Sequence, residues 1–133
     1  MMNEKEIFAL LKETKRKALA IYSNFRVAAV LVSKDGQMVT GVNIESSSYG
    51  LTICAERVAI FKALSEGIRE FRSIYIMSDG QKPCPPCGAC RQVLMDYAPN
   101  IEVKMVSEAG EVEQARLTDL LPHAFSGEAL KQR

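Results

Sequence analysis

Apolar residues near the start of the chain recur with the spacing of a helix. Asn3 can cap this helix, and Glu6 stands where the return partner of a capping box belongs. One helical face then has the apolar residues Ile7, Leu10, Leu11, Ala18 and Ile21. The opposite face has a basic cluster, which we interpret as solvated: Lys12, Lys15, Arg16 and Lys17. The pattern predicts a helix that continues until residues 22–24 break it.

The next apolar runs are short and rich in β-branched residues, which is typical of strands. Residues 26–33 are almost continuously apolar and predict a strand that is buried on both faces. Asp35-Gly36 favours a hairpin turn, because these residues tolerate positive φ, and residues 38–43 then return as a second strand. Three later strands are expected at residues 71–78, 101–106 and 111–117.

Two central helices are predicted to begin at cysteines. The first begins near Cys54, has apolar residues on several faces and ends at Gly67. The second begins at Cys87 and runs to Tyr97, because Pro99 cannot continue a helix. Both helices should therefore present a thiol at their N-terminal end.

The order of these elements indicates the fold. Strands alternate with helices after an opening hairpin, which predicts a three-layer α/β/α sandwich with a mixed five-stranded sheet. A crossover of helical length between two strands implies a parallel, right-handed pair. We expect one domain over residues 1–133, with a helical turn at 117–121 and a tail at 123–133 that Phe125 anchors.

Composition and charge exclude some classes of protein. The chain has 133 residues, of which 47% are apolar and 25% charged, and its net charge is +1. A nearly neutral chain lacks the basic field that holds a nucleic-acid backbone, so no nucleic-acid partner is expected. Residues 1–6 do not resemble a signal peptide, and no stretch has the roughly 18 apolar residues of a membrane span. We expect a cytoplasmic protein with no membrane partner, whose four cysteines are thiols or metal ligands.

Three of the cysteines have the spacing of a metal site. Cys87 and Cys90 form a Cys-x-x-Cys pair at a helix start, which points two sulfurs at one ion. The positive end of the helix favours the thiolate form. Cys54 is then the candidate for the third ligand, and three ligands leave one tetrahedral position open, as in catalytic zinc sites. Together with Glu56, two residues after Cys54, this arrangement matches the signature of the zinc deaminases, with cysteine in place of the first histidine.

A fourth cysteine leaves a second interpretation open. Cys84 and Cys87 also form a plausible pair, and four thiolates would close the site and make the protein a non-catalytic zinc module. Glu56 favours the open site, because a closed site has no use for a carboxylate two residues from a ligand. Beside an open site, Glu56 can act as the catalytic proton carrier. We therefore predict that Cys54, Cys87 and Cys90 bind one zinc ion and that Cys84 is a loop residue.

Two arginines next to the ligands are candidates for tuning the metal. Three thiolates around Zn²⁺ have a net charge of −1, which weakens the ion as a Lewis acid. Arg57 and Arg91 could offset this charge by donating hydrogen bonds to sulfur. The single histidine, His123, lies far from the motif and is expected not to bind the metal.

With these residues in view, the chain resembles the small, homotetrameric cytidine deaminases of the three-cysteine zinc type. The resemblance extends over residues 22–125. It rests on five blocks of sequence: Tyr22-Ser23-Asn24-Phe25, Gly41-Val42-Asn43-Ile44-Glu45, Cys54-Ala55-Glu56-Arg57, Pro86-Cys87-Gly88-Ala89-Cys90-Arg91-Gln92 and Leu120-Leu121-Pro122. The metal motif fits many deaminases, and the second block narrows the choice to those that act on free nucleosides.

The resemblance implies a reaction and a substrate site. The reaction is the zinc-dependent hydrolysis of the amino group of cytidine and deoxycytidine, which releases ammonia in pyrimidine salvage. Asn43 and Glu45 are implied to bind the ribose 3′-hydroxyl, and Phe25 to form an aromatic wall beside the pyrimidine. The backbone N–H of Ala55 and the carbonyl of Pro85 are implied to contact the base, together with Glu56.

The resemblance also implies an assembly. Phe125 is expected to reach into a neighbouring subunit's site, so that the active sites lie at the subunit interfaces of a homotetramer. Several residues depart from the family pattern: Ala28, Ser46, Ser47, Pro85 and His123. The closest alternative activity is that of an aminonucleoside deaminase of the blasticidin S type, which has similar metal blocks.

Overall fold

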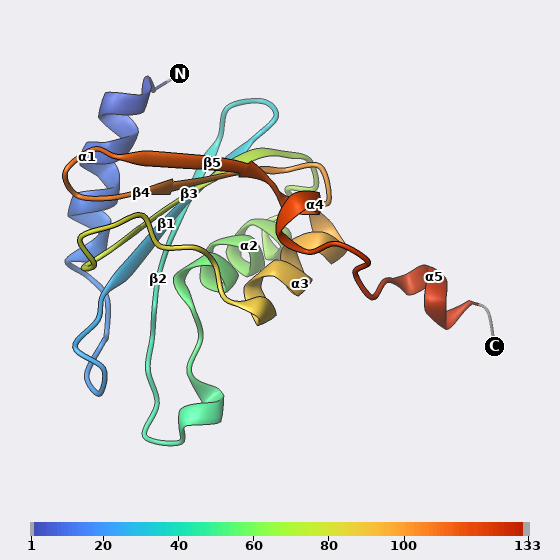
Figure 1. Ribbon diagram of the computed structural model, residues 1–133, viewed down its shortest axis with the longest axis horizontal. Helices are drawn as coiled ribbons and strands as arrows, with labels where there is room; N and C mark the ends of the chain where they lie inside the picture. Colours follow the sequence, from blue (N-terminus) through green and yellow to red (C-terminus); the bar gives the residue numbers. More distant parts are fainter. Residues whose placement is uncertain (1, 132–133) are drawn as a thin grey trace.

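One mixed sheet of five strands forms the centre of the protein (Figure 1). The structure is a computed structural model, and it describes residues 2–131. The strands are β1 (Val27–Ser33), β2 (Met38–Val42), β3 (Phe71–Ser78), β4 (Glu102–Val106) and β5 (Val112–Arg116). Their order across the sheet is β2-β1-β3-β4-β5. β3 and β4 are parallel and the other neighbouring pairs antiparallel, which confirms the expected mixed sheet.

Helices cover both faces of this sheet, which confirms the three-layer sandwich (Figure 1). The helices are α1 (Glu4–Lys15), α2 (Ala55–Ser65), α3 (Gly88–Tyr97), α4 (Leu117–Leu120) and α5 (Gly127–Leu130), with a 3₁₀ turn, η1, at Tyr49–Leu51. α1 packs on one face, and α2 and α3 pack on the other. β1 contributes alternate residues to the two cores, with Leu31 beside α2 and Val30 beside α1. A strand covered on both faces has to be apolar throughout, which explains its sequence.

The first helix is shorter than its apolar pattern predicts. Its capping is confirmed, because the Asn3 side chain accepts a hydrogen bond from the Glu6 backbone N–H at 2.9 Å. The helix nevertheless ends at Lys15, and the prediction that it continues to Ile21 is wrong. Beyond it the chain pairs with the segment after β2, where Leu19 donates to the carbonyl of residue 43 at 3.0 Å. This tertiary pairing competes with the helical hydrogen bonds that the spacing alone would favour.

The prediction that Lys15 is exposed to solvent, which rested on its place in a basic cluster, is also wrong. Its side chain is only 2% exposed, so it does not belong to a solvated face. The ammonium forms ion pairs with Asp79, at 3.0 Å, and with Glu108, and it donates to the carbonyl of Ser78 at 3.3 Å. A buried charge is tolerated when it is paired in this way.

The end of the chain differs from the expected anchored tail. It contains the short helix α5, and the Phe125 side chain is 60% exposed instead of buried. The backbone carbonyl of Phe125 accepts a hydrogen bond from the side chain of Gln92 at 2.9 Å. The segment projects from the sandwich as an arm (Figure 1). Across residues 2–131, none of the helices combines the length and apolar character needed to cross a membrane.

Gly41 in β2 allows α2 to lie unusually close to the sheet. A Cβ atom at Gly41 would lie 2.3 Å from the carbonyl oxygen of Ala55 and 2.7 Å from the backbone nitrogen of Ala59. Because both neighbours are backbone atoms, Gly41→Ala is expected to lower the free energy of unfolding by about 1–3 kcal/mol. Urea unfolding measures this loss. Gly50→Ala is the control, since nothing lies within 4 Å there, and equal stability of the two variants would contradict the close approach.

Candidate active site

Three thiols converge where α2 and α3 begin. Cys54 is the N-cap residue of α2, Cys87 is the N-cap residue of α3, and Cys90 lies in the first turn of α3. Their Sγ atoms all lie within 4.8 Å of one another. The Cys54 and Cys87 sulfurs are 3.6 Å apart, and those of Cys87 and Cys90 are 3.5 Å apart. All three are free thiols, and the fold therefore assembles a three-sulfur group.

This group fits a zinc ion. Tetrahedral Zn–S bonds of about 2.3 Å would place two sulfurs about 3.8 Å apart, close to the separations here. The two helix N-termini add positive potential that favours thiolates. The fourth cysteine, Cys84, does not belong to the three-sulfur group. It lies close by and lines the adjoining pocket. The donor set is thus that of a three-cysteine site for one zinc ion, as expected from the sequence.

Arg57 is placed to offset the negative charge of the sulfurs. Its Nη2 donates to Cys54 Sγ at 3.5 Å. The pKa of Cys54 is lowered, chiefly by a hydrogen bond from Cys90 and also by Arg57, whereas the same bond and burial raise the pKa of Cys90. The Nε of Arg57 is buried with no partner among residues 2–131. The Nε–H of Arg57 is thus available to donate a further hydrogen bond when the sulfurs become more negative.

Arg91 has a different environment from the one predicted. The guanidinium donates to the carbonyl of Pro86 at 2.8 Å and to that of Leu120 at 2.8 Å. Within residues 2–131, Arg91 therefore makes these hydrogen bonds in place of the expected one to sulfur. They connect the start of α3 with α4. Arg91 directly follows the predicted ligand Cys90 in the sequence. In helix α3, however, its side chain points toward the backbone carbonyls of Pro86 and Leu120.

A pocket of about 290 Å³ adjoins the three-sulfur group. Its lining residues are Ser23, Phe25, Val27, Asn43, Glu45, Thr52, Cys54, Ala55, Glu56, Ile76, Cys84, Pro85 and Cys87. The structure thus brings together six of the seven residues predicted to act on or bind substrate, all except Phe125. Among the described lining residues there is no lysine or arginine. The pocket is apolar with a few polar groups, as is typical of small-molecule sites.

Glu56 is the buried acid of this pocket. It lies in the first turn of α2 and is 4% exposed. Burial raises the pKa of Glu56 to about 7, and the Cys54 sulfur adds to this shift, while a hydrogen bond from its own backbone N–H opposes it. A carboxyl group with a pKa near the working pH can both accept and donate a proton. Glu56 is therefore suited to proton transfer inside the pocket.

Asn43 and Glu45 lie on the side of the pocket near Phe25. The Glu45 carboxylate accepts hydrogen bonds from the backbone N–H groups of Tyr22 and Ser23, each at 2.9 Å, and from the Ser23 hydroxyl. These bonds lower the pKa of Glu45, with the Ser23 hydroxyl as the largest cause. The Asn43 amide donates to the Phe25 carbonyl at 2.9 Å. Both side chains therefore fix the segment that precedes β1, besides lining the pocket.

Sequence reasoning missed several lining residues. Ser23 lies in the block Tyr22-Ser23-Asn24-Phe25, and its position two residues before Phe25 was the available signal. Thr52 and Ile76 gave no signal, because they reach the pocket only through the folding of a polar loop and through the register of β3. Cys84 was considered as a metal ligand and not as part of a pocket wall.

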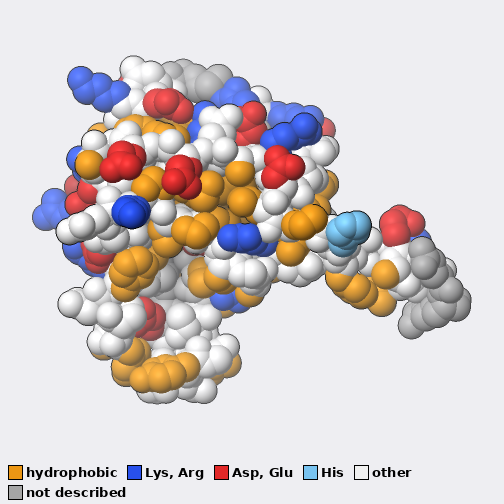
Figure 2. Space-filling model, in the orientation of Figure 1, with side chains coloured by type: hydrophobic (Ala, Val, Ile, Leu, Met, Phe, Trp, Pro, Cys, Tyr) orange, Lys and Arg blue, Asp and Glu red, His pale blue; other side chains and the backbone are white. Residues whose placement is uncertain are grey.

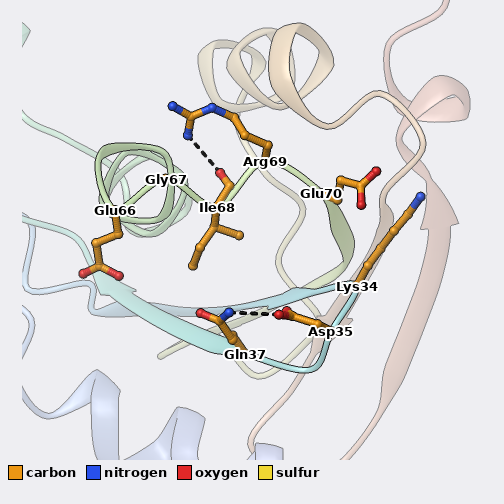
Figure 3. Close-up of a pocket in the computed structure, with 8 residues that line it drawn as sticks. All are labelled: Lys34, Asp35, Gln37, Glu66, Gly67, Ile68, Arg69 and Glu70. Atoms are coloured by element: carbon orange, nitrogen blue, oxygen red, sulfur yellow. Dashed lines mark hydrogen bonds between the residues drawn. The ribbon is translucent and has the colours of Figure 1, made fainter.

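A larger pocket, of about 580 Å³, lies between the β1–β2 turn and the end of α2 (Figure 3). Its wall is polar and partly held by local hydrogen bonds, such as those from Arg69 to the Ile68 carbonyl and from Gln37 to Asp35. None of its described lining residues is a cysteine or histidine. We therefore place the chemistry at the smaller pocket.

Known proteins share both the sequence and the fold. Residues 1–106 match the family described as the cytidine and deoxycytidylate deaminase zinc-binding region. Cytidine deaminase of Halalkalibacterium halodurans is 45% identical over 123 residues, which cover 90% of this chain and 93% of that protein. The crystal structure of cytidine deaminase from Burkholderia pseudomallei has a TM-score of 0.89 at 43% identity and covers 93% of this chain and 100% of that one. Blasticidin-S deaminase of Bacillus cereus is 31% identical over 108 residues, covering 75% of this chain and 76% of that protein.

Proposed function

Because this chain belongs to the cytidine and deoxycytidylate deaminase family, we propose that it hydrolyses cytidine and deoxycytidine to uridine and deoxyuridine, with release of ammonia. It is then a zinc-dependent hydrolase that acts on the C–N bond of a cyclic amidine. The observation that carries this function is the buried acid Glu56 beside a three-thiol group in one pocket.

The charges around the pocket favour a nucleoside over a nucleotide. A phosphate group needs a cation or a cluster of N–H donors. The described lining residues include neither lysine nor arginine, and Glu45 contributes a negative charge. Arg26, which follows Phe25 in the chain, is held by Asp79 through bonds of 3.0 Å from Nε and Nη2. These features support an uncharged substrate.

The lining residues suggest how the substrate is oriented. Phe25 supplies an aromatic face for the pyrimidine ring. Asn43 and Glu45 offer polar atoms for the ribose 3′-hydroxyl, and the pocket lining supports this role. The backbone N–H of Ala55 and the carbonyl of Pro85 are the groups proposed to contact the polar edge of the base, and both residues line the pocket.

The proposed chemistry centres on proton movement by Glu56. When it is bound by Cys54, Cys87 and Cys90, zinc supplies Lewis acidity that makes water nucleophilic near neutral pH. Glu56 accepts a proton from the attacking water and delivers it to N3 of the ring as oxygen bonds to C4. Glu56 then carries the second proton to the amino group, and the C–N bond breaks to release ammonia. The site also has to hold Glu56 away from bulk water, which its burial supports.

The proposed assembly is a homotetramer in the cytoplasm. Apolar side chains are exposed at the loop between β2 and α2 and on the C-terminal arm, including Tyr49 at 75%, Leu51 at 70% and Phe125 at 60%. Figure 2 shows apolar side chains at the bottom of the view, where the loop between β2 and α2 lies in Figure 1, and along the C-terminal arm. Exposed apolar groups of this kind support contacts between subunits. Phe125 lies outside the pocket of its own chain, so a role at the substrate would require a neighbouring subunit. The free thiols support a reducing compartment.

Ultraviolet absorbance of cytidine incubated with the purified protein tests the function directly. We expect loss of the cytidine absorbance with an equal release of ammonia, and no change when a chelator has removed the metal. Blasticidin S is assayed in parallel, because one relative that is 31% identical is a blasticidin-S deaminase. Turnover of blasticidin S without turnover of cytidine would replace the proposed substrate with this second one.

A further inference from the structure

Asp79 joins three segments that are far apart in the sequence. It directly follows β3, and its carboxylate contacts Arg26, which directly precedes β1, and Lys15 at the end of α1. Its Oδ2 accepts from the Arg26 backbone N–H at 2.8 Å and from Arg26 Nε at 3.0 Å, and its Oδ1 accepts from Arg26 Nη2 at 3.0 Å. Its backbone N–H in turn donates to the Arg26 carbonyl at 3.0 Å.

These contacts make a stronger link than an ordinary surface ion pair. Asp79 binds the fork of the guanidinium with both oxygens, and such bidentate pairs have a fixed geometry. The ammonium of Lys15, 3.0 Å from Oδ1, is buried, with 2% of its side chain exposed. Arg26, followed by Lys15, holds the pKa of the Asp79 carboxyl well below its usual range, against the effect of burial. The Asp79 carboxylate is therefore charged, and it is held between the guanidinium of Arg26 and the ammonium of Lys15.

Two of the three segments that Asp79 joins, the one before β1 and the one after β3, lead into the pocket wall. Phe25 precedes Arg26, and the loop that Asp79 begins leads to Cys84 and Pro85, all of which line the pocket. The loop also lies against the aromatic ring, because a Cβ atom at Gly80 would be 3.7 Å from Phe25 Cε1. The junction at Asp79 thus helps to set the separation between the ring and the loop, next to the pairing of Val27 with Ser78 in the sheet.

We propose that Asp79 is a positioning residue for the substrate: by clamping Arg26, it fixes the Phe25 ring relative to the loop that contains Cys84 and Pro85. The inference rests on the proposed function, since it assigns this wall to the pyrimidine. Asp79 does not line the pocket, and so it acts through Phe25 and the loop and not by contact with the substrate. Loss of the clamp widens the wall and weakens binding, while the proton transfer by Glu56 is retained.

Steady-state kinetics with cytidine test the proposal in Asp79→Asn and Arg26→Gln. We expect KM to rise about tenfold in each variant with kcat within about threefold of the wild-type value, because the clamp affects binding more than chemistry. The double variant should be no worse than Asp79→Asn alone, since both changes remove the same contact. Arg26 is 44% exposed, so we expect Arg26→Gln to fold even if Asp79→Asn does not. A KM for Arg26→Gln within twofold of the wild-type value would overturn the proposal.

Glu108→Gln is the matched control. Glu108 is the other carboxylate that pairs with Lys15. Within residues 2–131 it forms neither a hydrogen bond nor an ion pair with Arg26, and its charge has only the smallest effect on that guanidinium. A merely structural role of the ion pairs predicts a loss of thermal stability with no change of KM in any variant. The clamp predicts a raised KM in the Asp79 and Arg26 variants and an unchanged KM in Glu108→Gln.

A second measurement separates this proposal from the proposed function. In the zinc-loaded protein, the rate at which iodoacetamide alkylates Cys84 reports on the loop, and mass spectrometry assigns the modified residue. We expect Asp79→Asn and Arg26→Gln to raise this rate several-fold and Glu108→Gln to leave it unchanged. If wild-type protein fails to deaminate cytidine, the proposed function is wrong, and an unchanged alkylation rate in both variants overturns the clamp by itself.

Discussion

Replacing Glu56 with glutamine is expected to lower kcat for cytidine by about 10²–10⁴-fold, the usual contribution of a general acid–base group. Glutamine has nearly the same shape and no charge, so it fits the buried site, where burial raises the pKa of Glu56 and makes a charged side chain costly. It cannot accept a proton, and the reaction loses the group that moves protons from water to the base. Single-turnover and steady-state rates, with zinc content measured on the same samples, check this expectation.

Glu66→Gln is the control for that substitution. Glu66 is the C-cap residue of α2, the helix whose first turn contains Glu56, and it is exposed. Its replacement should leave kcat, KM and zinc content at wild-type values. Native activity in Glu56→Gln would remove Glu56 from the mechanism, whereas loss of zinc together with activity would assign it to the metal site instead.

Replacing Cys87 with serine is expected to abolish both zinc binding and deamination. The Cys87 sulfur lies 3.6 Å from that of Cys54 and 3.5 Å from that of Cys90, so it is central to the three-sulfur group. A serine hydroxyl is a poor zinc ligand at neutral pH, because only the deprotonated form replaces a thiolate well. Zinc measured by mass spectrometry should fall from about one ion per chain to background, and activity should fall with it.

Cys84→Ser is the matched control and also tests the zinc-module interpretation. Cys84 is a fourth cysteine close to the group but outside it, so its replacement should leave zinc content unchanged. Because Cys84 lines the pocket, KM is expected to change by less than about tenfold. Loss of zinc in Cys84→Ser, with no deamination by the wild-type protein, would instead indicate a closed four-thiolate site.

Much of the fold followed from local sequence features. The alternation of short β-branched runs with helical segments predicted the mixed sheet, and the strand at Phe71–Ser78 was predicted with its observed bounds. The Asn3 cap, the Asp35-Gly36 turn and the helix end at Gly67 were also predictable, because each depends on the conformational preferences of one or two residues. The failure at Ile21 has the opposite cause, since a pairing with a distant segment ended the helix early.

The candidate metal ligands and the acid were determined by the sequence itself. Cys54, Cys87, Cys90 and Glu56 lie at helix starts, where spacing and local geometry fix the direction of a side chain, and the thiols meet as predicted. Zinc binding and catalysis by these residues stay predictions until they are measured.

Only the tertiary structure decided the surroundings of that site. The burial of Lys15, the carbonyl partners of Arg91 and the junction at Asp79 all depend on which distant segments become neighbours. Sequence spacing shows which face of an element a residue occupies, but it does not show what that face meets. Ion pairs and pocket walls form across elements, and so their partners become known only when the elements are packed together.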